Sequence, residues 1–226
     1  MNAPRDREAA ARAYYRTRYR SDPRRAALWR HISRYLERWI RADADVLELA
    51  AGFCDFSNSI KARRRVAMDI NPEIASFAAE GVEVEIGDSS DLSRFQRGSF
   101  DVVFASNFLE HLEWPQIDSC MRGVREVLAP RGLLIVMQPN FRLRPREYFD
   151  DYTHRTVFSD RSLVDYLESA GLVCEHVEAR FLPFSMRSRF ARLAPIVPIY
   201  LRLPFRPFAG QMLVIAEEPS EGRDVG

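Results

Sequence analysis

Two acidic side chains in the first half of the chain have the spacing found in nucleotide-binding sheets. Glu48 lies within the apolar run Val46–Leu49, and Asp69 follows the next apolar run, twenty-one residues after Glu48. In open α/β sheets, a carboxylate at about this interval accepts hydrogen bonds from ribose hydroxyls. Gly52, just after the first run, tolerates backbone angles that let the chain approach a ligand closely. These residues predict a nucleotide-type site at the carboxyl ends of two strands.

Polar residues also end the next two apolar runs. Asp88 and Ser89 follow the third run, and Asn107 follows the fourth. The carboxyl ends of parallel strands meet at one edge of a sheet, so we expect these side chains to join the same site. A nicotinamide dinucleotide would require G-x-G-x-x-G after the first strand, and the sequence AAGFCD at 50–55 does not provide it.

Two histidines are candidates for acid–base chemistry. His111 follows Asn107 by four residues, which on a helical turn places both on one side of the chain. His154 ends a polar and aromatic loop that follows the fifth apolar run. Asp151 and Glu110 are carboxylates that can orient an imidazole ring. We take His111, His154 and Asp151 as the candidate catalytic residues, with Glu110 as a further orienting group.

The elements that must position these residues alternate between two patterns. Stretches of helical composition, near 57–64, 72–80, 116–128 and 160–170, separate apolar runs of strand length. The runs are Val46–Leu49, Val66–Met68, Val82–Ile86, Val102–Phe104, Leu133–Met137, Leu172–Val177 and Met212–Ala216. This alternation is typical of βαβ units, and it predicts a doubly wound α/β sheet of seven strands that is covered on both faces.

Three segments flank or interrupt this domain, which we place at 45–218. Residues 1–44 form a basic arm with an amphipathic helix and are a candidate lid. Residues 181–210 form an insertion rich in proline, arginine and aromatic residues before the last strand, and 219–226 are expected to be a disordered tail.

Composition excludes several classes of protein. The net charge is +1, so no global attraction to DNA or lipid is expected. Three cysteines at wide spacing favour a reducing compartment, and no metal site is expected from them. No apolar stretch is long enough to span a bilayer, so we expect a cytoplasmic protein.

Taken together, the ends of the four strands resemble the class I S-adenosylmethionine-dependent methyltransferases. The resemblance covers about residues 45–180 and the final strand. It implies a Rossmann-like seven-stranded sheet whose last strand is antiparallel, and S-adenosylmethionine as the cofactor. The cofactor-binding positions that it implies are Glu48, Ala50, Gly52, Asp69, Ile70, Asp88, Ser89 and Asn107. Glu48, Ala50, Gly52 and Cys54 occupy the E/D-x-G-x-G-x-G positions, where only one of the three glycines is present.

The sequence does not identify the molecule that accepts the methyl group. Residues after the fifth run resemble a bacterial subgroup associated with surface glycan and lipid-linked sugar synthesis, which implies O-methylation of a small molecule or saccharide. The insertion at 181–210 would suit peripheral contact with the inner face of a membrane, or simply cover the sheet edge. An RNA methyltransferase and a non-catalytic scaffold remain alternatives, and no DNA partner is expected.

Overall fold

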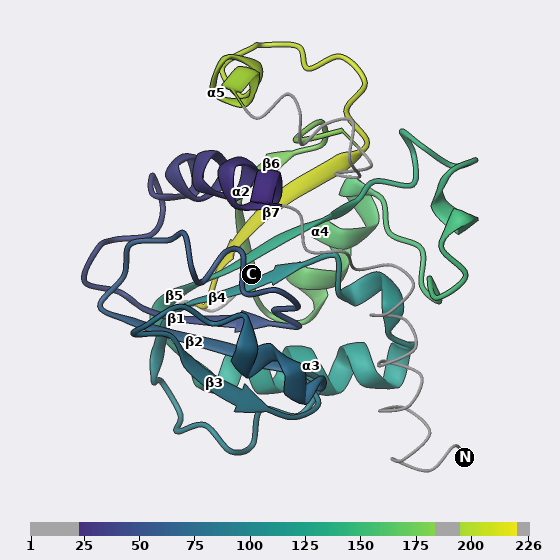
Figure 1. Ribbon diagram of the computed structural model, residues 1–226. Coiled ribbons are helices and arrows are strands. Elements are labelled where there is room, and N and C mark those ends of the chain that lie inside the picture. The colour runs from purple at the N-terminus through teal and green to yellow at the C-terminus, as the bar shows by residue number, and fades with distance from the viewer. Residues whose placement is uncertain (1–22, 184–194, 221–226) are drawn as a thin grey trace.

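The computed structural model describes residues 23–183 and 195–220, and its centre is one seven-stranded sheet (Figure 1). The strands are β1 (Asp45–Leu49), β2 (Arg64–Asp69), β3 (Glu83–Ile86), β4 (Phe100–Ser106), β5 (Leu128–Pro139), β6 (Val173–Glu178) and β7 (Gln211–Glu217). Their order is β3-β2-β1-β4-β5-β7-β6. The first five strands are parallel to one another, and β7 is antiparallel to both of its neighbours, β5 and β6. The expected fold class and its antiparallel last strand are confirmed.

Four α-helices accompany the sheet in the described part of the chain: α2 (Pro23–Leu36), α3 (Trp114–Val127), α4 (Asp160–Ser169) and α5 (Val197–Tyr200). Short 3-10 turns occupy Pro72–Ser76, Leu109–His111 and Tyr148–Asp150. A capping box between Glu113 and Gln116 begins α3, and the Ser159 side chain accepts from the Ser162 amide to begin α4. None of these helices has the length and apolar character required to cross a membrane.

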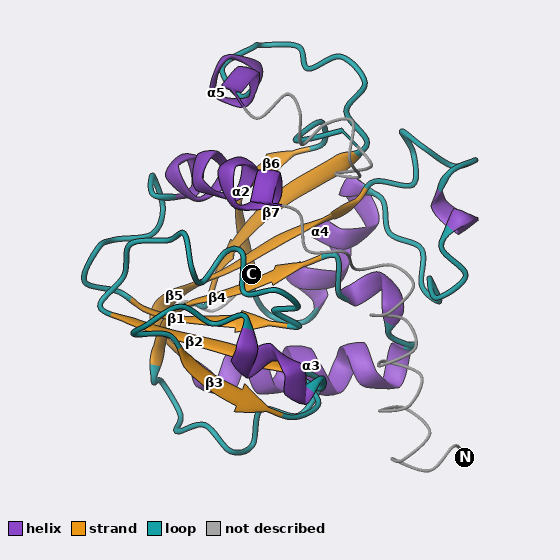
Figure 2. Ribbon diagram, in the orientation of Figure 1, coloured by secondary structure: helices purple, strands orange, loops and turns teal. Residues whose placement is uncertain are grey.

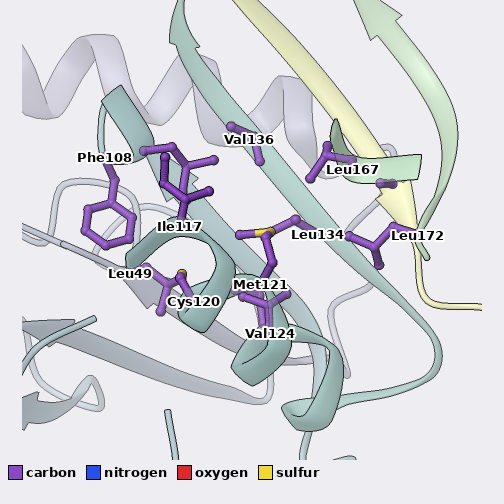
Figure 3. Close-up of a cluster of buried hydrophobic side chains, with 14 of the residues drawn as sticks. Leu49, Phe108, Ile117, Cys120, Met121, Val124, Leu134, Val136, Leu167 and Leu172 are labelled. Atoms are coloured by element: carbon purple, nitrogen blue, oxygen red, sulfur yellow. The ribbon is translucent and has the colours of Figure 1, made fainter. Parts of the chain in front are cut away.

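The helices lie on both faces of the sheet, as Figure 2 shows. One core packs α3 and α4 against strand residues such as Leu49, Leu134 and Val136 (Figure 3). The opposite core packs α2 against the alternate strand residues, among them Ile135 and Leu213. Successive strand side chains point to opposite faces, which is why β1, β4, β5 and β7 each contribute to both cores.

The amphipathic helix expected near the N-terminus is α2, and a polar cluster joins it to two distant segments. Glu178 at the end of β6 accepts hydrogen bonds from Tyr35 of α2 and from Arg206. Arg206 is 8% exposed and also donates to the Leu201 carbonyl. Arg206, one of the arginines of the insertion, therefore does not face lipid or phosphate, because its guanidinium donates to internal partners.

One helix expected from the sequence is absent. Residues 52–60 form consecutive turns, and 61–63 lead directly into β2, so the stretch near 57–64 is not an α-helix. The Asn58 side chain bonds the Phe77 carbonyl and the Ala79 amide, which links this turn to the next connection. The stretch 72–80 is likewise shorter than expected, with only Pro72–Ser76 in a 3-10 helix.

Part of the sequence interpretation falls outside the described residues. The first half of the basic arm, with the lid that we expected, lies in 1–22, and the centre of the insertion lies in 184–194. Most of the expected disordered tail, 221–226, also lies outside them.

Candidate active site

The loop after β1 adopts a backbone conformation that suits glycine at every second residue. Ala50, Gly52 and Cys54 have φ angles of 50°, 56° and 54°, all in the left-handed region. These are the three positions at which the sequence resemblance places glycines, so the loop keeps its shape although two of them carry side chains. Cys54 is fully buried, and burial raises the pKa of its thiol well above the ordinary value, so it is not a nucleophile.

Side chains from the ends of β2 and β3 hold this loop in place. Asp69 Oδ2 accepts from the Gly52 amide at 2.8 Å, and its Oδ1 accepts from the Asn71 amide at 2.8 Å. Ser89 Oγ accepts from the Ala50 amide at 3.0 Å. The expected convergence of three strand ends is thus present. A carboxylate oxygen has two lone pairs, so Asp69 keeps acceptor capacity toward a ligand hydroxyl.

Glu48 has a different environment from Asp69. Its Oε2 accepts from the amide and the hydroxyl of Ser57, at 2.9 and 2.6 Å, and its side chain is 4% exposed. Burial raises the pKa of this carboxyl to about 8. Glu48 is therefore mostly protonated at neutral pH.

The other proposed cofactor residues lie at the same edge of the sheet. Asp88 Oδ1 accepts from the amide and hydroxyl of Ser90, and Ile70 is partly exposed directly after Asp69. Asn107 has a φ of 49°, and its Oδ1 accepts from Gln211 Nε2 at 2.9 Å. Sequence reasoning missed Gln211, because it begins the last strand and only the insertion of β7 beside β5 brings it near β4.

A second group of polar residues follows β4 and β5. His111 and His154 have ring centroids 4.9 Å apart, with their planes at 68°. The Glu110 carbonyl accepts from the amides of Arg155 and Thr156, and this pairing brings the 151–156 loop onto the turn that holds His111. The two histidines, 43 residues apart in the chain, thus lie side by side in the structure.

A hydroxyl relay fixes the orientation of His111. Thr153 Oγ1 donates to Asp151 Oδ1 at 2.6 Å and lies 2.9 Å from His111 Nδ1. Because the hydroxyl has a single proton, His111 Nδ1 must donate to it, and the lone pair of the ring is on Nε2. Burial, followed by the nearby His154, lowers the pKa of His111 to about 4, so this ring is neutral at pH 7.

Glu110 is the most buried charged group of this cluster. It is 0% exposed, and neither carboxylate oxygen has a hydrogen-bond partner among the residues that the structure describes. Burial, with a smaller contribution from Asp151, raises its pKa to about 8. One ligand atom each from Glu110, His111 and His154 lie within 4.8 Å of one another.

A surface hollow of about 480 Å³ lies elsewhere in the molecule. It is bordered by Arg125 in the last turn of α3, by Tyr166 of α4 and by Glu218 after β7. These residues lie toward the amino ends of the parallel strands, so the hollow is at the opposite edge from Asp69 and His111.

The residues at the carboxyl edge fit S-adenosylmethionine as a ligand. The left-handed loop after β1 would hold its amino-acid part, and the acceptor atoms of Asp69 and Asp88 match the hydroxyl and amino donors of an adenosine. Asn107 and the histidine cluster would then lie on the side where an acceptor meets the methyl group. This fit rests on the loop conformation and on the donor set.

Comparison with known proteins finds one family match and several similar folds. Residues 47–136 match the family model described as a methyltransferase domain. The fold resembles a SAM-dependent methyltransferase from Archaeoglobus fulgidus, with 17% identity, a TM-score of 0.63, and coverage of 85% of this chain and 94% of that one. A possible histamine N-methyltransferase from Thermotoga maritima is 15% identical, with a TM-score of 0.61 and coverage of 93% and 95%.

A third similar structure is a putative methyltransferase of Haloferax volcanii, solved in complex with the Trm112 methyltransferase activator. It is 14% identical, with a TM-score of 0.62 and coverage of 97% of this chain and 99% of that one. No curated protein matches the chain. The match over 47–136 indicates a methyltransferase domain in this part of the chain, and the fold is the one that these methyltransferase structures share.

Proposed function

We propose that the protein transfers a methyl group from S-adenosylmethionine to a hydroxyl of a small molecule or saccharide, including a lipid-linked sugar. The observation that carries this proposal is the cluster of Glu110, His111 and His154 at the carboxyl edge of β4 and β5. A hydroxyl is neutral near pH 7 and gains from groups that bind its oxygen or take its proton, whereas an amine acceptor has less need of them.

Two groups of residues at the carboxyl edge of the sheet would have different roles, one in cofactor binding and the other in acceptor binding. The Ala50–Cys54 loop, Asp69 and Asp88 would bind the cofactor, and Asn107 lies between them and the acceptor side. S-Adenosylmethionine supplies an electrophilic methyl group on a sulfonium when bound. His111 and His154 would contact the acceptor oxygen, with Asp151 orienting His111 through Thr153. Holding the acceptor in line and excluding water would supply much of the rate enhancement.

Exposed apolar side chains around the acceptor side favour a saccharide or a lipid-linked sugar. Phe149 and Tyr152, in the loop that leads to His154, are 57% and 70% exposed. Aromatic faces of this kind bind amphipathic ligands. The second half of the insertion adds exposed Phe205 and Phe208, and the Phe208 carbonyl accepts from Arg144 in the loop after β5. We propose that this surface contacts the acceptor or the membrane that carries it.

The argument for a non-catalytic scaffold is weakened by the backbone conformation of the loop after β1. It rests on the missing glycines at Ala50 and Cys54, yet both residues adopt the backbone angles that a glycine would. The RNA alternative rests on the basic arm and on the arginines of the insertion. Arg206, which belongs to that set, is buried in an internal ion pair.

Calorimetric titration tests the proposed cofactor site. The purified protein should bind S-adenosylmethionine and S-adenosylhomocysteine with micromolar affinity and should not bind NAD. Asp69→Ala should weaken the binding of both by roughly 30- to 1000-fold, since it removes charge-assisted hydrogen bonds worth about 2–4 kcal/mol. The matched control is Asp43→Ala, an exposed carboxylate before β1.

Circular dichroism establishes that each variant is folded. Failure of the folded wild-type chain to bind either sulfur compound would support the scaffold alternative, and unchanged affinity in Asp69→Ala would overturn the assignment of Asp69. Transfer of labelled methyl groups to hydroxyl-bearing saccharides, compared with transfer to RNA, then identifies the acceptor class.

A further inference from the structure

Glu110 is a buried carboxyl group that no described side chain compensates. Its side chain is 0% exposed, and none of the described residues donates a hydrogen bond to either oxygen. The carboxyl group of Asp151 repels a charge on Glu110 and so adds to this cost. A buried carboxyl group without donors is costly, and proteins compensate it either by protonation or by a cation or metal ion beside it.

The two imidazoles beside Glu110 are arranged as metal ligands usually are. His111 donates through Nδ1 to Thr153, which in turn donates to Asp151, so that Nε2 presents its lone pair. Metal-ligating histidines commonly direct their other ring nitrogen to such a partner, which fixes the tautomer and the ring orientation. The ring of His154 is packed against that of Tyr148, 4.7 Å away between centroids, which limits its rotation.

We propose that Glu110, His111 and His154 bind one divalent first-row transition-metal ion. Their ligand atoms lie within 4.8 Å of one another. Metal–ligand bonds of about 2.0–2.2 Å place neighbouring ligand atoms roughly 3–4 Å apart, so small side-chain rotations complete the site. Two nitrogen ligands and one oxygen favour zinc, iron, cobalt or manganese over magnesium and calcium, which prefer oxygen ligands.

Three protein ligands leave coordination positions for an exogenous oxygen. This role of the site rests on the proposed O-methyltransferase function. An acceptor hydroxyl bound there would have a lowered pKa and would release its proton to water. The acceptor oxygen then forms a bond to the methyl carbon as the carbon–sulfur bond breaks, and the bonding pair remains on sulfur, giving a neutral thioether and the methyl ether.

The binding itself is tested without methyl transfer. The full chain, without a histidine tag, is freed of metal with a chelator and titrated with Co²⁺, whose visible absorption reports nitrogen and oxygen ligands. One equivalent should bind and produce d–d absorption, and Zn²⁺ should displace it. Mn²⁺, followed by electron paramagnetic resonance, is the second probe.

Substitutions locate the site. Glu110→Gln and His154→Asn should each weaken Co²⁺ binding by about 100-fold or more, and Thr153→Val, which acts through His111, by roughly 10- to 100-fold. Thr153→Ser restores the hydroxyl and should restore the affinity. His31→Asn, on α2 and outside the cluster, removes one imidazole and should leave binding and spectrum unchanged.

The outcomes separate this proposal from the proposed function. Absence of stoichiometric Co²⁺, Mn²⁺ and Zn²⁺ binding in a folded protein that binds S-adenosylmethionine would overturn the metal site and leave the histidines as direct proton acceptors. Metal binding that survives Glu110→Gln and His154→Asn would overturn it too. Metal binding by a chain that does not bind S-adenosylmethionine would retain the site and contradict the proposed function.

Discussion

Ala50 occupies a backbone position that an alanine rarely adopts. Its φ of 50° costs about 1–2 kcal/mol in an L-residue that has a Cβ. Ala50→Gly removes this cost but adds about 0.4–1 kcal/mol of conformational entropy to the unfolded chain. We therefore expect the free energy of unfolding to rise by up to about 1 kcal/mol, measured by urea denaturation.

The neighbouring alanine is the control for this substitution. Ala51 is 7% exposed, and its φ is not in the left-handed region. Ala51→Gly should lower the free energy of unfolding by roughly 1 kcal/mol, since it adds chain entropy and removes a buried methyl group. Equal destabilisation by the two substitutions would show that the backbone of Ala50 is not strained.

Individual site residues differed in how well the sequence predicted them. Asp69, Ser89 and Asn107 follow apolar runs directly, so their convergence follows from strand order alone. The contact of Glu110 with His154 depends on the path of the loop after β5, which hydrogen bonds to the Glu110 carbonyl determine. The metal-type cluster was missed because cysteine spacing, the usual sequence guide, plays no part in it.

The polar cluster between α2, β6 and the insertion makes stability depend on pH. Although burial acts to raise it, hydrogen bonds from Tyr35, His176 and Arg206 hold the pKa of Glu178 below its ordinary value. A lowered folded-state pKa contributes stability above the unfolded-state value, near 4.3, and that contribution is lost as pH falls through the folded-state value. We expect Glu178→Gln to cost about 3 kcal/mol at pH 7 and to flatten the loss of stability below about pH 4.5.

Thermal or urea denaturation across pH 3 to 7 measures this effect. Glu175→Gln is the matched control, because Glu175 lies on the same strand and is exposed. Its effect should stay within about 0.5 kcal/mol at every pH. If Glu178→Gln and the wild type lose stability in parallel on acidification, the cluster is not the source of the dependence.

Among the elements, strands were predicted better than helices. Each apolar run became a strand, and for the central strands the reason is that burial on both faces of a sheet requires continuous apolar sequence. The stretch near 57–64 has helical composition, but its residues form turns in which Phe56 and Ile60 are buried. The Asn58 side chain forms hydrogen bonds with the backbone of Phe77 and Ala79, in the connection between β2 and β3. Propensity alone does not contain such tertiary contacts.

At the scale of the molecule, the second half of the insertion presents an apolar surface. Ile196, Ile199, Phe205 and Phe208 are between 51% and 73% exposed, on and beside α5, which projects at one end of the molecule (Figure 1). We expect weak binding to vesicles that contain anionic lipid, because inserted apolar side chains gain about 1.5–3 kcal/mol each. Flotation with such vesicles measures the binding.

The double substitution Ile199→Glu and Phe205→Glu should reduce this binding by at least about 10-fold. Ile86→Glu makes the same kind of change at another exposed apolar residue, at the end of β3, and should have no effect. Wild-type protein that remains entirely with the soluble fraction would exclude membrane contact and leave the surface as part of the acceptor site.

The position of β7 between β5 and β6 has a consequence for synthesis on the ribosome. β6 pairs only with β7, and one edge of β5 does so as well. Until residues 211–217 have left the exit tunnel, β6 has no strand partner and β5 presents an open, apolar edge. Unpaired edges of this kind recruit other chains. The nascent protein is therefore most exposed to aggregation just before its last strand emerges, and that strand closes the sheet and completes Gln211's contact with the candidate site in one step.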